Sequence, residues 1–252
     1  MDGMIIQRND MYWQVGLMGY ANRNKILKIN SALEEMNKTN QENQYLSDTP
    51  LAQYAAGEST TAIKVVRSGG IDPATGKEVY IKLNGERTFE YDPADKYNAG
   101  DTQPQFSGSL RSTFYWKGIN LSVYFDYTLG GYIYNSTRAT KVEGTNPIYN
   151  ADSRVFDSRW KQPGDLAIYR DIADSSAPRM TDRFVEKDNT LNFASINIGY
   201  NFPQSICSKF FAQSMWLGVN IKDIVRLSTV KVERGTYYPY SKGFEIDLTL
   251  TF

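Results

Sequence analysis

Side chains that commonly carry out catalysis are scarce in this sequence. Its 252 residues contain no histidine and a single cysteine, Cys207. Ser-His-Asp and Cys-His catalysis are therefore excluded, and only carboxylate, lysine or tyrosine chemistry remains open to an enzyme. Asp92 and Asp95 could bind calcium, but they lack the full spacing of a calcium loop, and we interpret 92–95 as a solvated turn. We expect no enzymatic activity, no metal and no cofactor.

The charge balance and the aromatic content narrow the class of protein. The 28 basic residues equal the 28 acidic ones, so nucleic acid is not an expected partner. Eighteen Tyr, twelve Phe and four Trp accompany a polar composition, which is typical of a β-barrel with aromatic girdles and a wet lumen. No apolar run is long enough for a transmembrane helix. Residues 1–8 contain no export signal, and we therefore expect an incomplete chain.

The end of the chain alternates strictly between apolar and polar residues. Period-two alternation predicts a strand with one apolar and one polar face. An apolar face toward lipid, a polar face toward the lumen and a terminal aromatic residue are typical of the closing strand of an outer-membrane barrel. An edge strand of a soluble sandwich is the alternative. The apolar positions are Phe244, Ile246, Leu248, Leu250 and Phe252.

A long hairpin is predicted in the middle of the chain, over 106–116 and 119–129. Its strands of about 11 residues match the length that a tilted strand needs to cross hydrocarbon. Lys117-Gly118 supplies a two-residue turn. Four polar-face residues could contact cargo or simply line a wet lumen: Arg111, Tyr115, Tyr124 and Asp126.

Further strands are predicted from the same alternation, which gives about six long strands. Residues 13–19, 196–202 and 217–221 alternate, 4–6 could pair with 13–19, and a change of parity predicts a bulge near Ala194-Ser195. The connections alternate between short (7–10, 117–118 and 203–213) and long (22–104, 130–189 and 228–241). Short periplasmic turns and long extracellular loops alternate in this way in outer-membrane barrels. The predicted fold is all-β: an antiparallel transmembrane β-barrel segment, an incomplete barrel, with long extracellular loops.

The connection 22–104 contains structure of its own. Residues 62–66 and 78–82 are expected to be strands flanking a turn at 72–76, where Pro73 and Gly76 suit the corners. Residues 26–29 are expected to prolong a hairpin above the membrane. The connections 22–104 and 130–189 are expected to be extracellular loop regions.

The order of these segments resembles the C-terminal quarter of the SusC/RagA-type TonB-dependent outer-membrane transporters. The resemblance is colinear over essentially the whole chain. Its pieces are 24–29 (NKILKI), 70–76 (GIDPATG), 100–109 (GDTQPQFSGS), 115–123 (YWKGINLSV), 125–127 (FDY) with 130–131 (GG), 159–160 (RW), 198–203 (IGYNFP), 218–221 (GVNI) and 238–239 (YP) leading to Phe252.

The resemblance implies a barrel of about 22 strands in the outer membrane, closed by an N-terminal plug. It implies a SusD-like surface lipoprotein as a lid, energy from the TonB complex, and import of oligosaccharides or peptides. It further implies that the barrel assembly machinery recognises Phe252 as an assembly signal. The plug is absent from 1–252, so we expect a truncated chain that is not active alone. Arg159 and Trp160, in the loop 130–189, could touch substrate or the lid lipoprotein, or could anchor the loop.

A second hypothesis belongs to another class of protein. A soluble all-β carbohydrate-binding module would use the Tyr and Trp surplus for stacking on sugars. Such a module would be soluble without detergent, whereas a barrel segment in contact with outer-membrane lipid would not.

Overall fold

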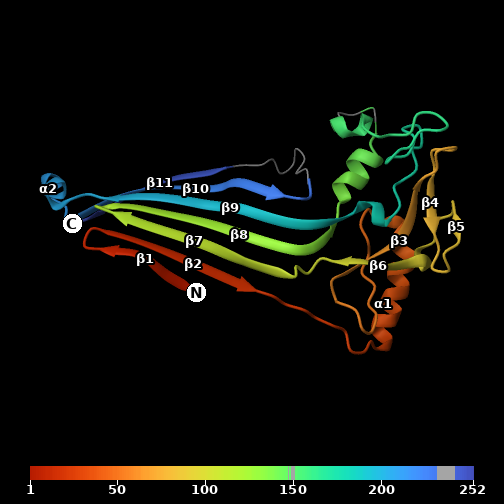
Figure 1. The fold of residues 1–252 in the computed structure, drawn as a ribbon, viewed down its shortest axis with the longest axis horizontal. Helices are drawn as coiled ribbons and strands as arrows, with labels where there is room; N and C mark the ends of the chain where they lie inside the picture. Colours follow the sequence, from red (N-terminus) through yellow and green to blue (C-terminus); the bar gives the residue numbers. More distant parts are fainter. Residues whose placement is uncertain (147, 149–150, 232–241) are drawn as a thin grey trace.

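The computed structural model describes residues 1–146, 148, 151–231 and 242–252. Its main feature is a long seven-stranded antiparallel sheet in the order β1-β2-β7-β8-β9-β10-β11 (Figure 1). The strands are β1 (Asp2–Arg8), β2 (Met11–Tyr20), β7 (Phe106–Trp116), β8 (Ile119–Tyr134), β9 (Val185–Asn201), β10 (Ser214–Ser228) and β11 (Gly243–Thr251). The all-β antiparallel fold is confirmed, and within the described residues the sheet is open, with β1 and β11 at its edges.

A smaller four-stranded sheet lies beyond one end of the long one, in the order β5-β4-β3-β6 (Figure 1). Its strands are β3 (Ala62–Ile71), β4 (Glu78–Ile81), β5 (Arg87–Thr88) and β6 (Lys96–Asp101). Helices are few and short: α1 (Ser31–Glu42), α2 (Gln204–Cys207), the π-helical η3 (Arg138–Glu143), and the 3-10 turns η1 (Asn43–Leu46), η2 (Pro93–Asp95), η4 (Ser153–Phe156), η5 (Asp182–Phe184) and η6 (Ser208–Phe210). None of the described helices has the length and apolar character needed to span a membrane.

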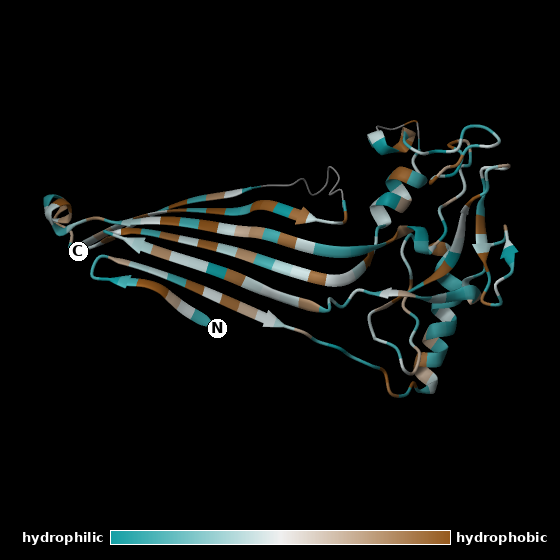
Figure 2. Ribbon diagram, in the orientation of Figure 1, coloured by the Kyte–Doolittle hydropathy of each residue, from teal (hydrophilic) through white to brown (hydrophobic). Residues whose placement is uncertain are grey.

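Strand register in the long sheet places apolar side chains in rows across one face. Figure 2 shows the alternation of hydrophobic and hydrophilic residues along the strands. The apolar face is uncovered, since Ile246 is 62% and Leu248 60% exposed. One apolar row is Trp13, Phe114, Leu121, Ile198, Val219 and Ile246, and a neighbouring polar row on the opposite face is Gln14, Thr113, Ser122, Asn197, Asn220 and Glu245.

Two local expectations about the long sheet are confirmed. Lys117 (φ 47°) and Gly118 (φ 90°) both adopt left-handed conformations, as a two-residue hairpin turn requires. In β9, Ser195 pairs with Tyr124 and Phe193 pairs with Phe125, so Ala194 is an extra residue and the bulge lies where the change of parity predicts it. The bulge keeps both halves of β9 in phase with the apolar face.

The ends of the long strands differ from the expected ones. Strand β8 continues through Gly130 (φ 79°), and Gly131–Tyr134 pair with Val185–Asp188 after a register shift, so the connection covers 135–184 rather than 130–189. The expected strand at 26–29 is wrong: this segment is irregular, and Ile26 instead bonds to the backbone of Gly57 and Glu58. Part of the connection 228–241 lies outside the described residues.

The smaller sheet follows the sequence expectations. Asp72 accepts hydrogen bonds from the amide and hydroxyl of Thr75, and Gly76 (φ 69°) completes the turn between β3 and β4. Asp92 accepts a hydrogen bond from the Ala94 amide at the start of η2, so 92–95 is a turn. The buried residues Ile63, Val65 and Met180 form a core that brings the connections 21–105 and 135–184 together.

Candidate functional site

The polar face of the long sheet carries four of the predicted contact residues. Arg111 and Tyr124 are direct cross-strand partners, Asp126 pairs with Ser109, and Tyr115 pairs with Asn120. The Tyr115 ring stacks on Tyr12 with centroids 5.3 Å apart. The structure therefore places the four on one face.

Arg111 also forms an exposed ion pair with Asp2, at 3.3 Å between Nη2 and Oδ1. Exposed pairs of this kind contribute little to stability. The Arg111 guanidinium thus stays accessible to a solute on the polar face.

A small cavity of about 130 Å³ lies beside the bulge of β9. Asp126 is the only one of the predicted contact residues that lines it. Strand β10 is irregular at the same level, where Asp223 (φ 55°) adopts a left-handed conformation. Bulges re-aim side chains near binding sites. The cavity is lined by Asp126, Asn192, Phe193, Ala194, Asp223, Val225 and Arg226.

Buried ion pairs join the two long connections at the end of the sheet. Arg183 donates from Nε and Nη2 to the two carboxylate oxygens of Glu78, at 2.8 Å each, and from Nη2 to Glu143 at 3.0 Å. Glu143 also accepts from Nε of Arg170 at 2.8 Å. Burial lowers the pKa of Arg183, but Glu78 and Glu143 raise it by more, so the group stays charged. Glu78 comes from the connection 21–105, so Arg183 binds one connection to the other.

Arg159 and Trp160 occupy loop-anchoring positions. Arg159 is only 7% exposed, and its guanidinium donates to the backbone carbonyls of Val142, Glu143, Val155 and Arg170. The indole of Trp160 donates to the carbonyl of Pro73 at 2.9 Å, across the two connections. Of the alternatives open for this pair, anchoring of the loop is the one that their contacts fit.

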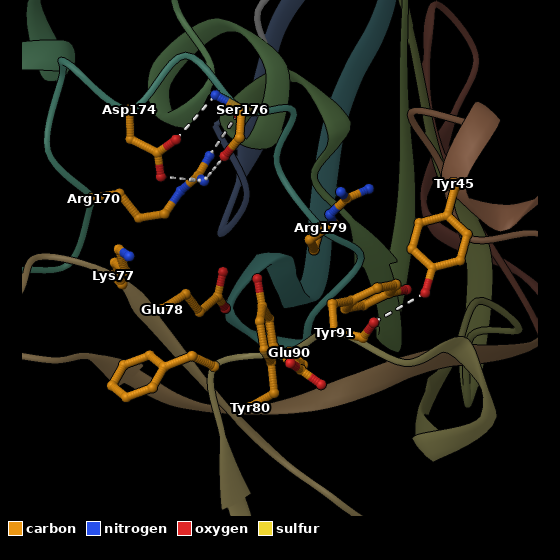
Figure 3. Close-up of a pocket in the computed structure, with 11 residues that line it drawn as sticks. Tyr45, Lys77, Glu78, Tyr80, Glu90, Tyr91, Arg170, Asp174, Ser176 and Arg179 are labelled. Atoms are coloured by element: carbon orange, nitrogen blue, oxygen red, sulfur yellow. Dashed lines mark hydrogen bonds and ion pairs between the residues drawn. The ribbon is translucent and has the colours of Figure 1, made fainter.

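A larger cavity of about 470 Å³ opens where the two connections meet (Figure 3). Three of its tyrosines pack together: the ring of Tyr91 packs edge-on against Tyr80 at 5.5 Å and Tyr45 at 5.7 Å. The guanidinium of Arg179 lies over the Tyr45 and Tyr91 rings, at 5.1 and 5.7 Å. The cavity is lined by Tyr45, Lys77, Glu78, Tyr80, Phe89, Glu90, Tyr91, Arg170, Asp174, Ser176 and Arg179.

Sequence reasoning missed this cavity. Its residues come from four separate segments, 45, 77–80, 89–91 and 170–179, and none of these carries a recognisable motif. The surplus of tyrosine was the one available signal, because a polar protein seldom exposes so many aromatic side chains without a binding role.

A buried lysine next to these segments leads to a test of pH dependence. Lys96 donates to the side-chain oxygen of Gln44, and burial lowers the pKa of Lys96 to about 8. The folded chain therefore loses this proton at lower pH than the unfolded chain, so stability of the smaller sheet should rise by about 1–2 kcal/mol between about pH 7.5 and 9.5. Protection of β3 and β6 from proteolysis should increase over this range. Lys96→Met should remove the pH dependence, and the exposed Lys82→Met should leave it intact; an unchanged slope in Lys96→Met would contradict the assignment.

Comparison with known proteins gives one consistent family. No family model matches the sequence. Two TonB-dependent receptors of Formosa agariphila are similar to it, at 25% identity over 168 residues and 24% over 158, covering 65% and 63% of this chain. The chain spans about 15% of the length of these curated relatives.

Solved structures of RagAB match over the whole chain. The RagAB peptide transporter aligns with a TM-score of 0.75 at 17% identity, and the RagAB peptide importer in the closed-closed state with 0.76 at 18%. Each alignment covers 100% of this chain and 28% of the other. At these identities the match shows the fold, which agrees with the sheet register and with the named relatives. In sequence the chain is therefore similar to TonB-dependent receptors, and in fold it is similar to part of the RagAB transporter structures.

Proposed function

We propose that this chain forms a stretch of barrel wall, with its extracellular loops, in an outer-membrane transporter that imports oligosaccharides or peptides. The observation that carries the proposal is the uncovered apolar face of the long sheet. In water such a face would need a second layer to cover it. In an outer membrane the lipid covers it, and the polar rows face the lumen.

A polar residue among the apolar ones, Ser112, also supports this assignment. Ser112 lies among apolar neighbours, and its hydroxyl accepts a hydrogen bond from the indole nitrogen of Trp13 at 2.9 Å. Polar groups that face hydrocarbon need internal partners. Ser112 has one.

The arrangement of the connections supports an orientation for the wall. The two long connections, 21–105 and 135–184, meet at one end of the sheet, while the short turns and α2 lie at the other (Figure 1). Long loops of outer-membrane barrels are extracellular and short turns periplasmic. We assign the large cavity and the smaller sheet to the extracellular side.

A SusD-like surface lipoprotein is the proposed partner on that side. Apolar side chains without cover on the two connections suit a protein interface. They include Leu46, Leu83, Phe89, Phe156 and Leu166. The TonB complex and the barrel assembly machinery are further proposed partners, the second through Phe252, which follows β11.

Cysteine labelling tests location and orientation together. In cells that express the protein from its natural gene, Thr75→Cys and Lys161→Cys should react with a membrane-impermeant maleimide. Lys209→Cys, in η6, should react only after the outer membrane is permeabilised. Thr75, Lys161 and Lys209 are exposed and lie outside the apolar set named for the partner, and the native Cys207 is only 1% exposed, so background labelling should be low.

Two outcomes would contradict the proposal. Labelling of Lys209→Cys but not of the other two on intact cells would reverse the orientation. Recovery of the protein in a soluble fraction without detergent would favour the carbohydrate-binding module instead.

A further inference from the structure

The large cavity contains charges that the protein itself does not satisfy. Arg170 is engaged by Glu143, Asp174 and Ser176. Glu78 is held by Arg183. By contrast, Lys77 and Arg179 form no ion pair among the described residues, and Glu90 forms none either, although its charge also acts on Lys82 outside the cavity. Two free cations and one free carboxylate therefore face the cavity, which favours a ligand with one negative charge.

Arg179 is the better placed of the two cations. Its guanidinium rests on the rings of Tyr45 and Tyr91, which fix its position without neutralising its charge. A planar guanidinium can donate two parallel hydrogen bonds to a carboxylate, and this geometry is specific as well as strong. A guanidinium already held in place also loses less side-chain entropy on binding.

The aromatic walls complete the site. Phe89 is exposed, and Tyr80 and Tyr91 are held by their edge-on packing, so rigid ring surface borders the free charges. The hydroxyls of Tyr80 and Tyr91 make no hydrogen bond within the described part of the chain. Burial raises the pKa of both groups, so they remain protonated donors at neutral pH.

We propose that this cavity binds a small ligand that carries a single carboxylate beside a ring with an apolar face. Arg179, with Lys77 at the rim, receives the carboxylate, and the ring lies against the aromatic wall. Glu90 accepts hydrogen bonds from the far side of the ligand. Two sources share this chemistry: a uronic acid residue of an oligosaccharide, and an aromatic residue at the carboxyl end of a peptide. The inference rests on the proposed function only for the statement that the cavity faces outward.

Binding is measured on the protein purified in detergent, by ligand-observed NMR, with two matched pairs of probes. Glucuronate is compared with glucose, and the dipeptide Gly-Phe with its C-terminal amide. At least one carboxylate should bind saturably, and about tenfold more tightly than its neutral counterpart. A preference for glucuronate identifies the oligosaccharide source, and a preference for Gly-Phe the peptide source.

Three variants test whether the carboxylate binds in this cavity. Arg179→Met should weaken carboxylate binding by about tenfold while leaving the neutral probe unchanged. Arg67→Met is the matched control, because Arg67 lies over the Tyr97 ring in the same way, at 4.6 Å, but outside the cavity. Lys77→Met should reduce carboxylate binding by less than Arg179→Met does. Because Lys77 is exposed, this variant should fold normally, and it therefore still tests the site if Arg179→Met misfolds.

Equal binding of acid and neutral probes, binding of neither acid, or full binding by both cavity variants would overturn the proposal. Failure of the cysteine labelling would remove only the outward orientation, since binding in detergent does not depend on it.

Discussion

Deleting Ser122 should prevent the protein from assembling in the outer membrane, whereas deleting Ala194 should leave most of it folded. Ser122 lies in β8, between Thr113 of β7 and Asn197 of β9, where the register is regular on both sides; the extra residue of β8 lies farther along the strand, near Gly130. A one-residue shift turns one half of the strand over. If the half before Ser122 turns over, Ile119 and Leu121 move from the apolar face to the polar face, which costs about 1.5–3 kcal/mol for each side chain. If the half after Ser122 turns over, Asp126 moves to the apolar face.

Ala194 is the control because it is already the extra residue. Without it, Phe193, Ser195 and Ile196 alternate regularly, so both apolar side chains stay on the apolar face. The measurement is the amount of heat-modifiable, protease-resistant protein in outer-membrane fractions. Equal assembly of the two deletions would show that the alternation of faces does not control insertion.

Arg183→Met should loosen both long connections while leaving the long sheet intact. The change leaves the Glu78 carboxylate, only 2% exposed, without the cation that binds both its oxygens, and it removes one of the two cations that bind the fully buried Glu143. Removing one member of a buried ion pair typically costs about 3–5 kcal/mol. We expect fast proteolytic cleavage within 21–105 and 135–184, and unchanged heat-modifiability of the protein, since the long sheet is not affected.

Two further variants distinguish this effect from ordinary loss of an ion pair. Lys82→Met breaks an exposed pair with Glu86 in the same smaller sheet and should change cleavage little. The double change Arg183→Met and Glu78→Met should recover part of the protection, because Glu78 then no longer stays buried without a cation, and Glu143 keeps Arg170. Unchanged cleavage in Arg183→Met would mean that the two connections are held together by other contacts.

Much of the long sheet could be predicted because its signal is local. A lipid-facing strand must alternate residue by residue, so the tail 244–252, the turn at Lys117-Gly118 and the bulge at Ala194 are each readable from a few neighbouring residues. The strand ends were harder to place. Gly130 resembles a strand terminator, but its left-handed conformation is absorbed in a register shift and the ladder continues to Tyr134.

The cavity and the loop packing could not be predicted, since they depend on contacts between residues far apart in sequence. Arg159 is fixed by carbonyls of irregular backbone, such as that of Val142, which no periodic pattern reveals. The apolar run 26–29 resembles a strand, yet a strand needs a neighbour, and the backbone of Ile26 pairs with 57–58 instead. Among the predicted contact residues, Asp126 borders a cavity because a bulge lies beside it, and the sequence predicts that bulge.

The ion pair between Arg183 and Glu78 also limits how such receptors can be recombined. A chimaera that takes residues 135–184 from a relative but keeps 21–105 would place a foreign loop against Glu78, with no assurance of a matching cation. The same holds for Trp160, whose indole is bonded to the carbonyl of Pro73. The two connections therefore depend on each other structurally, and an exchange of loops that is meant to change specificity has to transfer both of them together.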